Sequence, residues 1–332
     1  MSLDYNPVTM SVRLAVRDLP HLRRALFSWY GKNGRDLPWR KTKDPYRILV
    51  SEVMLQQTRV AVVIKRYQRF LQRFPSVLDL ARAKEASVLA EWSGLGYYRR
   101  ARNLYATAKL IVSERKGELP RSSEDLQALP GIGRYTASAV ASIAYGEAVA
   151  VVDGNVQRVL TRLLGRVMRD AKLWSVAQTL LDPRRPGDFN QAMMELGATL
   201  CLPDEPHCAV CPIQKFCRTR GRGQTLKSRP RQFQREVTYT LSLRGDSVLL
   251  VRRPIGQTLM PAMWELPEAT SLNAANELLF TVKHSITVTD FKVKVVSWRG
   301  DAASGRWLKI SRLSAIPITG LTRKILGRAG VI

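Results

Sequence analysis

The chain has 332 residues, which is long enough for two or more domains that each bury a core of their own. Lys and Arg total 53 against 27 Asp and Glu, so the formal net charge is +26. A charge of this size predicts a polyanionic partner, with nucleic acid as the leading one. The sequence has no apolar run of eighteen residues and no lipidation motif, so we expect no association with a membrane.

In chain order, the first twenty residues, MSLDYNPVTMSVRLAVRDLP, lack the apolar core of a signal peptide, so we expect a cytoplasmic, nucleoid-associated location. Residues 20–217 have apolar side chains at helical spacing, interrupted by Gly and Pro, which predicts an almost wholly helical region. The predicted helices cover residues 45–73, 86–93, 99–114, 123–128, 135–145, 155–164, 174–181 and 188–200.

Residues 218–235 mark a change in composition, because they carry seven basic residues and no acidic one. This predicts a solvated linker. After it apolar side chains alternate, and Arg244 to Ser247 give a turn signal between two such runs, which predicts a β-hairpin. The predicted strands cover residues 237–243, 248–251, 280–288, 291–298 and 305–310, and the predicted helices cover 271–279 and 320–328. We therefore predict a mainly α region of residues 1–217, a linker of residues 218–235, and a smaller α+β domain of residues 236–332.

The stretch ILVSEVMLQQT, residues 48–58, places a glutamate inside an apolar run. Asp44 is the expected N-cap of its helix and Pro45 the first helical residue. At helical spacing Glu52 shares the apolar face with Ile48, so it should be buried. Burial removes water from the ionised carboxylate and favours its neutral form. We therefore predict that Glu52 is a neutral acid in an apolar pocket.

The motif LPGIGRYTASAVA, residues 129–141, has a Gly-x-Gly turn between two predicted helices. Gly131 and Gly133 let backbone N–H groups approach a phosphate, and the helix that follows adds a favourable dipole. In a basic chain this favours a helix-hairpin-helix that binds the DNA backbone without reading its sequence. An ordinary turn between two helices is the alternative.

Asp153 follows an apolar run and precedes an amphipathic helix in AVAVVDGNVQRVLTRLL, residues 148–164. It is expected at or near the N-cap, where free N–H groups and the helix dipole favour the ionised form. A purely structural cap is the alternative. A neutral Glu52 and an ionised Asp153 together provide an acid and an anion stabiliser, the arrangement that breaks glycosidic bonds. We therefore predict that Glu52 acts as a general acid.

All four cysteines, Cys201, Cys208, Cys211 and Cys217, fall within CLPDEPHCAVCPIQKFC, with the spacing C-x6-C-x2-C-x5-C. In a reducing compartment, crowded cysteines are typical of metal ligands rather than disulfides. The spacing leaves three interpretations open: a [4Fe–4S] cluster held by four thiolates, a tetrahedral zinc ion, and unrelated buried thiols. The compact, basic loop favours a structural group over a catalytic one.

Six segments carry a family resemblance: SEVMLQQT, SGLGYYRRARNL, LPGIGRYTASA, VVDGNVQRVL, FNQAMMELGATLC and the cysteine loop. In this order, and across residues 20–217, they resemble adenine DNA glycosylases of the MutY family. That family belongs to the helix-hairpin-helix superfamily that includes endonuclease III. The resemblance implies two helical subdomains beside a DNA cleft, a [4Fe–4S] loop at residues 201–217, and a Nudix-like recognition domain after the linker. It also implies a reaction, the removal of adenine mispaired with 8-oxoguanine.

The resemblance implies roles for individual residues. Glu52 matches the general acid that protonates a flipped adenine at N7. Asp153 matches the carboxylate that stabilises the oxocarbenium-like sugar by charge or by a transient covalent link. Other residues match positions beside the two carboxylates (Tyr135 and Asn155), the adenine pocket (Trp39, Arg40 and Gln191, with Arg35 near the sugar), the wedge in the base stack (Gln57 and Tyr97), and the surroundings of the opposing lesion (Thr58 and Leu95). Packing or capping for Tyr135 and Asn155, and a core role for Trp39, are the alternatives.

Tyr135 stands where enzymes of the endonuclease III type have a lysine that forms a Schiff base, which implies a monofunctional glycosylase. Residues 248–268 and 305–326 resemble the beginning and end of the family's Nudix-like domain. The Glu-rich metal-binding helix is absent from residues 271–279, so we do not expect nucleotide hydrolysis. The family's lesion-reading Phe-Ser-His aligns with residues 286–288, where Thr287 keeps a hydroxyl but the imidazole is absent.

The expected substrate is double-stranded DNA containing A:8-oxoguanine or A:G, bound by a monomer. Two alternatives stay open. A thymine or uracil mismatch glycosylase of the same superfamily would share the active site but generally lacks a counterpart of residues 237–332. A non-catalytic DNA-binding protein would explain the charge, the hairpin and the cysteines, but not Glu52 on an apolar face together with Asp153.

Overall fold

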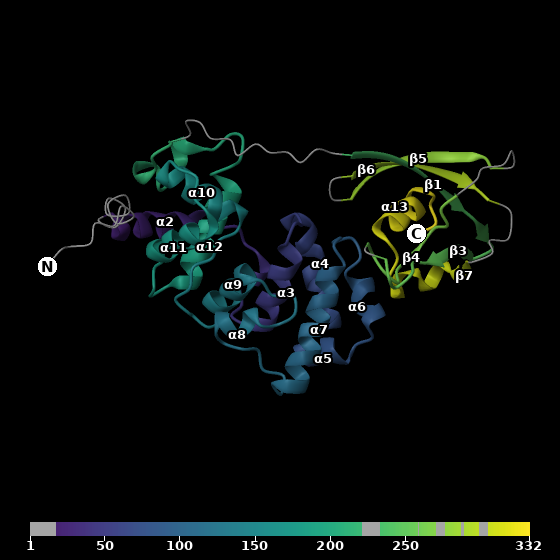
Figure 1. The fold of residues 1–332 in the computed structure, drawn as a ribbon, viewed down its shortest axis with the longest axis horizontal. Coiled ribbons are helices and arrows are strands. Elements are labelled where there is room, and N and C mark those ends of the chain that lie inside the picture. The colour runs from purple at the N-terminus through teal and green to yellow at the C-terminus, as the bar shows by residue number, and fades with distance from the viewer. Residues whose placement is uncertain (1–17, 221–232, 258, 270–275, 287–288, 299–304) are drawn as a thin grey trace. The chain divides into compact units, whose positions relative to one another are not determined.

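The computed structural model describes residues 18–220, 233–257, 259–269, 276–286, 289–298 and 305–332 (Figure 1). The chain divides into two compact units, and neither is continuous in sequence. Unit 1 comprises Met1–Gln57 and Leu110–Lys227, and unit 2 comprises Thr58–Lys109 and Ser228–Ile332. The sequence-based boundaries at residues 217 and 236 divide the chain differently and stay a prediction.

Unit 1 is helical, as the sequence predicts. Its α-helices are α2 (Leu19–Asn33), α3 (Pro45–Leu55), α8 (Ser123–Gln127), α9 (Arg134–Ala144), α10 (Gly154–Leu164), α11 (Asp170–Leu180) and α12 (Pro186–Thr199). Short 3-10 helices cover Pro38–Arg40, Cys208–Val210 and Gln214–Phe216. The apolar faces of α2, α10, α11 and α12 share one core, in which Leu26, Leu160 and Leu196 are fully buried. Since α3 and α8 pack on α9, and α12 packs on α9, α10 and α2, these contacts bring the candidate site residues of unit 1 together.

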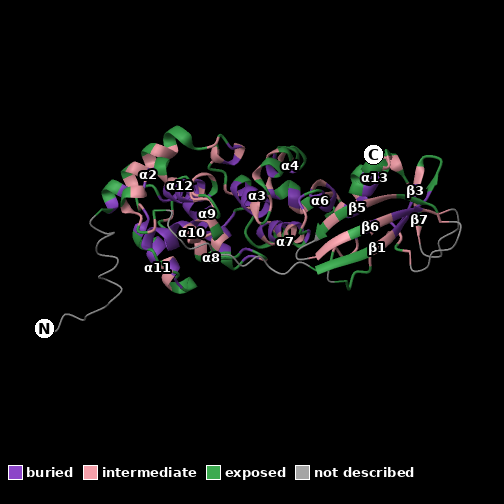
Figure 2. Cartoon of the chain, turned by 90° about the horizontal axis from the view of Figure 1, so that it is seen from above, coloured by how far each residue is buried: buried purple, intermediate pink, exposed green. Residues whose placement is uncertain are grey.

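The predicted helix over residues 45–73 is wrong, because the structure has two helices there, α3 and α4 (Val60–Arg73). Between them Gln57 has a φ of 54°, in the left-handed region that a right-handed helix does not use. The apolar pattern continues on both sides of the break, so periodicity alone did not reveal it. Within α3 the side chains are buried almost all round, and not on one face as the pattern suggests (Figure 2).

Unit 2 combines helices with two small sheets. Its helices are α4, α5 (Val77–Arg82), α6 (Glu85–Glu91), the first part of α7 (Arg99–Glu114), and α13 (Gly320–Arg328). Its strands are β1 (Phe233–Leu241), β2 (Leu243–Arg244), β3 (Ser247–Arg252), β4 (Trp264–Glu265), β5 (Leu278–Ile286), β6 (Thr289–Ser297) and β7 (Arg306–Lys309). β6 lies between β1 and β5, parallel to β1 and antiparallel to β5, while β3 pairs antiparallel with β2, β4 and β7. Val248, Val293 and Ile325 are fully buried in the core that the strands share with α13.

The α+β prediction for the C-terminal region is confirmed, with two corrections. The hairpin consists of β2 and β3 alone, since β1 pairs with β6 instead. The predicted helix 271–279 is wrong at its end, because Leu278 and Leu279 begin β5, whose pairing with β6 overrides their helix propensity. Residues 271–275 lie outside the described residues. The predicted helix 320–328 is confirmed as α13, and a Nudix-like identity of this region stays a prediction.

None of the helices in the described part of the chain is both long and apolar enough to cross a membrane.

Candidate active site

Glu52 lies on α3, and the start of this helix is fixed as the sequence predicts. The Asp44 side chain caps it by accepting hydrogen bonds from the backbone N–H groups of Tyr46, at 2.9 Å, and Arg47, at 3.2 Å. Glu52 is 4% exposed, so its predicted burial is confirmed. The pKa of the Glu52 carboxyl is raised from 4.5 to about 7. Burial is the largest cause of this net increase; the hydrogen bond from Tyr135 opposes it, and the charge of Asp153 adds to it. At neutral pH a large fraction of Glu52 therefore carries a proton.

Tyr135 is the direct partner of Glu52. It stands in the first turn of α9, and its hydroxyl donates a hydrogen bond of 2.6 Å to Glu52 Oε2. The same hydroxyl lies 3.5 Å from the sulfur of Met194 on α12. Burial and the nearby charge of Glu52 hold the pKa of the phenol well above its usual value, so Tyr135 stays a donor at neutral pH. Tyr135 thus orients the Glu52 carboxyl through its Oε2.

Asp153 is the N-cap of α10, as the sequence predicts. Its Oδ1 accepts a hydrogen bond of 2.7 Å from the Val156 N–H, and its Oδ2 accepts one of 3.0 Å from Asn155 Nδ2. Asn155 in turn accepts a 2.9 Å hydrogen bond from Arg158. These hydrogen bonds therefore orient both oxygens of the half-buried Asp153 carboxylate, whose charge raises the pKa of Glu52. The structure brings Glu52, Tyr135, Asp153 and Asn155 into one region, and their catalytic roles stay a prediction.

Arg35 and Arg40 meet at Glu195, a residue that sequence reasoning missed. Arg35 Nε and Nη2 donate to the two Glu195 carboxylate oxygens at 2.8 and 2.7 Å, and Arg40 Nη2 donates to Oε2 at 2.7 Å. Glu195 is completely buried, which by itself would raise its pKa, but these hydrogen bonds lower it to about 2. The charge of Arg40 also lowers the pKa of Glu52, so this cluster borders the acid. The available signal was a glutamate inside the apolar run of FNQAMMELGATLC.

The other predicted pocket residues, Gln191 and Trp39, are both buried. Gln191 stands one helical turn before Glu195 on α12, and Trp39 lies beside Arg40 in a 3-10 helix. Gln191 is thus within one helical turn of Glu195, and Trp39 is the sequence neighbour of Arg40. Their burial fits a pocket wall and a core residue equally, so their roles stay a prediction.

The hairpin of α8 and α9 has the turn that the sequence predicts. Gly131 has a φ of 72°, which favours glycine, and Gly133 is the N-cap of α9. No atom lies within 4 Å of the position that a Cβ on Gly133 would occupy. Leu129 and Ile132, on either side of Gly131, are buried and hold the turn against the core. The exposed glycines thus leave the start of α9 open to a phosphate, while DNA contact itself stays a prediction.

In unit 2, Thr58 and Leu95 are held together. The Thr58 hydroxyl donates to the Leu95 carbonyl at 3.2 Å, and Arg100 Nη2 donates to both the Thr58 hydroxyl, at 3.0 Å, and the Leu95 carbonyl, at 2.9 Å. Tyr97 is exposed and has a φ of 48°, a strained value for an aromatic residue. Gln57 directly precedes Thr58 in the chain but belongs to unit 1, and Thr287 lies outside the described residues.

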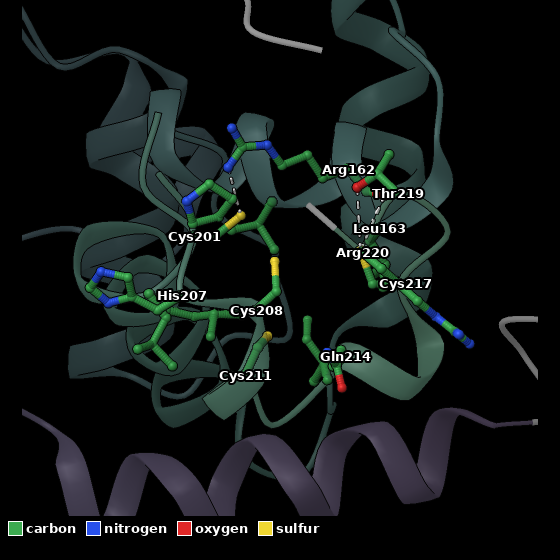
Figure 3. A pocket seen from close by; sticks show the side chains of 15 residues that line it. Arg162, Leu163, Cys201, His207, Cys208, Cys211, Gln214, Cys217, Thr219 and Arg220 are labelled. Atoms are coloured by element: carbon green, nitrogen blue, oxygen red, sulfur yellow. Dashed lines mark hydrogen bonds between the residues drawn. The ribbon is translucent and has the colours of Figure 1, made fainter. Parts of the chain in front are cut away.

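The four cysteines line one cavity of about 30 Å³ at the ends of α10 and α12 (Figure 3). All four are free thiols. Arg162 holds their loop by donating to the carbonyls of Leu202 and Pro203, both at 2.6 Å, and its Nη1 lies 3.4 Å from the Cys201 sulfur. Burial raises the pKa of the Cys211 thiol to about 11, and the neighbouring cysteines raise it too. Four thiols around one cavity form a donor set that a cationic, thiophilic group would fit, since it would stabilise their ionised form.

Within the described ranges, no three His, Cys, Asp or Glu side chains are grouped to hold a single metal ion. The zinc ion and the iron–sulfur cluster require different placements of the four cysteine sulfurs. One zinc ion needs its four ligands drawn to one point, whereas a cubane is wider and presents several irons to the thiolates.

Residues 50–173 match the model of the HhH-GPD superfamily of base excision DNA repair proteins. The α8–α9 hairpin, Tyr135 and Asp153 all lie within this match, so the fold and the site define a protein of that superfamily.

Individual relatives identify the family within this superfamily. An adenine DNA glycosylase of Buchnera aphidicola (subspecies Acyrthosiphon pisum) is 34% identical over 254 residues, which cover 73% of this chain and 73% of that protein. The adenine DNA glycosylase of Homo sapiens is 49% identical over 222 residues, 62% of this chain and 41% of the relative. That of Arabidopsis thaliana is 39% identical over 318 residues, 78% of this chain and 50% of the relative. The chain belongs to the adenine DNA glycosylase family, and it spans about half the length of the human and plant relatives.

Solved structures agree on the fold of the helical region. A thermostable thymine-DNA glycosylase matches with a TM-score of 0.57 and 29% identity, over 61% of this chain and 96% of that one. Endonuclease III trapped in a covalent complex with DNA matches with a TM-score of 0.54 and 24% identity, over 62% of this chain and 96% of that one. The endonuclease III likeness concerns the fold alone.

Proposed function

We propose that the protein is a monofunctional DNA glycosylase that excises adenine mispaired with 8-oxoguanine or guanine in double-stranded DNA. One observation carries this proposal: Glu52 is buried, has a pKa of about 7, and receives a hydrogen bond from Tyr135 beside the charge of Asp153. The names of the relatives, adenine DNA glycosylases, support adenine as the base.

In the proposed reaction the adenine is flipped out of the duplex and meets Glu52. Glu52 donates its proton to adenine N7, and the bond from the sugar C1′ to N9 breaks with its electron pair moving to the base. Adenine leaves as a neutral molecule, while positive charge develops on the sugar. Asp153 lies close enough for its charge to act on Glu52, and we assign it the stabilisation of that positive charge. A water then adds at C1′ and gives its proton to the Glu52 carboxylate, which leaves an abasic site and restores the acid.

The Glu195–arginine cluster gives the pocket a fixed wall. Its three side chains form charged hydrogen bonds of 2.7–2.8 Å, so Arg40 is held in place before a base arrives. We assign Arg35, Arg40, Trp39 and Gln191 to the adenine pocket, where rigid placement limits the loss of entropy on binding.

A monofunctional reaction follows from the side chain at residue 135. A Schiff base with the sugar needs an amine, and a phenol whose pKa is raised offers none. Its place beside Glu52 suits it to orient the acid instead.

For the cysteine loop we propose a [4Fe–4S] cluster held by Cys201, Cys208, Cys211 and Cys217. The support is the shared cavity and the four-thiol donor set. When bound, the cluster would give structural cross-linking of the loop, and no step of base excision passes through it. Arg162 would then contribute by holding the loop's carbonyls and by placing a positive charge beside Cys201.

We further propose that unit 2 reads the base opposite the adenine, through Thr58, Leu95 and Tyr97 and through a Nudix-like region that includes Thr287. The support is the strained, exposed Tyr97, two residues after Leu95, and the hydrogen-bonded Thr58–Leu95 pair. We expect the protein to act as a monomer.

The test is the release of bases from a panel of duplexes that contain A:8-oxoguanine, A:G, A:C, T:G or U:G. Excision of adenine from the first two, and its loss in Glu52→Gln with DNA binding retained, is the expected result. Release of thymine or uracil instead would move the protein to the mismatch glycosylases that share this fold. Tight binding of all five duplexes with no base released would leave a non-catalytic DNA-binding protein.

A further inference from the structure

Asp153 stands at the end of a segment without regular secondary structure that connects α9 to α10, residues 145–153. The hydrogen bonds of its side chain explain how Asp153 caps α10, but not what fixes the position of Asp153 itself. The backbone before Asp153 has no strand partner, so its N–H and C=O groups need other partners if the segment is to stay in one conformation.

Asn190 on α12 supplies one set of partners. Its Oδ1 accepts a hydrogen bond of 3.1 Å from the Val151 N–H, and its Nδ2 donates to the Val149 carbonyl at 2.9 Å. Nδ2 also donates to the Ser142 hydroxyl on α9 at 2.9 Å. Asn190 is 2% exposed, so water does not compete for these bonds. One buried amide therefore joins the segment two residues before Asp153 to both α9 and α12.

Gln178 on α11 supplies a second set in the same pattern. Its Oε1 accepts from the Ala150 N–H at 2.9 Å, and its Nε2 donates to the Ala148 carbonyl at 2.7 Å. The four residues 148–151 thus each give one backbone bond to a side-chain amide, alternately from Gln178 and from Asn190. The two side-chain amides thus supply the backbone hydrogen-bond partners that a neighbouring strand would supply in a sheet.

The upstream end of the segment is also fixed. The Glu147 carboxylate accepts hydrogen bonds from the N–H of Ser123, at 2.6 Å, and from its hydroxyl, at 2.8 Å, at the start of α8. The segment is therefore held at Glu147 through its side chain and at residues 148–151 through the backbone.

We propose that Asn190 and Gln178 are positioning residues that set the place of Asp153 relative to Glu52. This inference rests on the proposed function of Asp153 as the group that faces the developing positive charge. Loss of either amide frees N–H and C=O groups two to five residues before Asp153, and the carboxylate moves away from the sugar. A displacement of about 1 Å in such a group lowers a rate by roughly 100-fold.

The test compares Asn190→Asp and Gln178→Ala with a matched control, Ser142→Ala. Asn190→Asp keeps the size of the side chain but removes the donor to Val149. Gln178 is exposed, so its replacement leaves the core intact and keeps the test valid if Asn190→Asp does not fold. Ser142→Ala removes a buried hydrogen bond of the same Asn190 but spares those to the segment.

Two measurements on the 332-residue chain separate positioning from general stability. The first is the single-turnover excision rate against the Kd for the same duplex. The second is the Kd ratio for duplexes with a neutral tetrahydrofuran or a cationic pyrrolidine in place of the sugar, because only the cation reports on the charge of Asp153. We expect Asn190→Asp to lower both the rate and the preference for the cation by roughly 10- to 100-fold, and Gln178→Ala by roughly 3- to 10-fold. The substrate Kd should stay within about twofold, and Ser142→Ala should stay within about twofold of wild type in every measurement.

If Asn190→Asp and Gln178→Ala both match Ser142→Ala in rate and in preference for the cation, the positioning role is refuted. Amide hydrogen exchange gives a readout that needs no activity. The N–H groups of Ala150 and Val151 should exchange faster in the two variants and not in Ser142→Ala, and unchanged exchange would also refute the inference. Wild-type protein that neither excises adenine nor prefers the cation would refute the proposed function, and the exchange rates would still decide whether the two amides hold the segment.

Discussion

Replacing Glu52 by Gln should stabilise the folded protein at alkaline pH while it abolishes excision. Burial raises the pKa of Glu52 in the folded protein from 4.5 to about 7. Between these two values the folded protein binds one proton more than the unfolded chain, so the free energy of unfolding falls as the pH rises through this window. At about 1.4 kcal/mol per pH unit, the loss between pH 5 and pH 8 is roughly 2–3 kcal/mol. Glutamine carries no charge at either pH and avoids this loss.

The assay is urea unfolding of wild type and Glu52→Gln at pH 5 and pH 8, followed by circular dichroism of the helices. Other groups titrate in both proteins, so the difference in stability between the two isolates Glu52. That difference should shift by roughly 2–3 kcal/mol in favour of the variant at pH 8. Tyr135 can still donate to the new amide oxygen, which limits other changes. Glu114→Gln, at the exposed end of α7, is the matched control for the loss of one carboxyl.

A stability difference that is the same at pH 5 and pH 8 would refute the reasoning, because an acid with a raised pKa must produce a pH-dependent cost. Full excision activity in Glu52→Gln would refute the catalytic part separately. The two outcomes are independent, since one reports on the burial of the carboxyl and the other on its proton.

Four further predictions test the proposed function. Under subsaturating conditions the excision rate should fall about tenfold per pH unit above pH 7, as Glu52 loses its proton, and a rate independent of pH between 6 and 9 would contradict the assignment. Purified protein should be brown with about four irons per chain, and Cys211→Ser should lower that count, whereas colourless protein with one zinc would contradict the cluster. Borohydride should trap little covalent complex with abasic DNA, because Tyr135 offers no amine; efficient trapping near Tyr135 would indicate a bifunctional enzyme. Thr287→Val should lower the preference for A:8-oxoguanine over A:G by about 2- to 13-fold, and an unchanged ratio would show that this hydroxyl does not read the lesion.

Local features of the site could be predicted from the sequence. Burial of Glu52, capping by Asp44 and Asp153, and the glycine turn at Gly131 all depend on residues within one or two helical turns. Spacing and residue type alone therefore predict them.

Long-range features could not be predicted in the same way. Glu195 meets Arg35 across 160 residues, and no periodicity reports such a pair. The amides of Asn190 and Gln178 resemble ordinary polar residues on their helices until the fold brings residues 148–151 against them. The break at Gln57 lies in a backbone angle and leaves the apolar pattern unchanged. Side-chain partners and backbone angles are set by tertiary contacts, which a single sequence does not display.

The packing of α2 on α12 has a consequence for the synthesis of the chain. α2 ends at Asn33 and α12 begins at Pro186, so about 150 residues must be translated before α2 can meet its partner. At roughly 5–20 residues per second this takes roughly 8–30 seconds. During that time Leu22 and Leu26, which are buried in the finished protein, have only part of their core available. The ribosome therefore presents the apolar face of α2 to the cell long before the core around it is complete, and a chaperone that binds short apolar segments would find its target there.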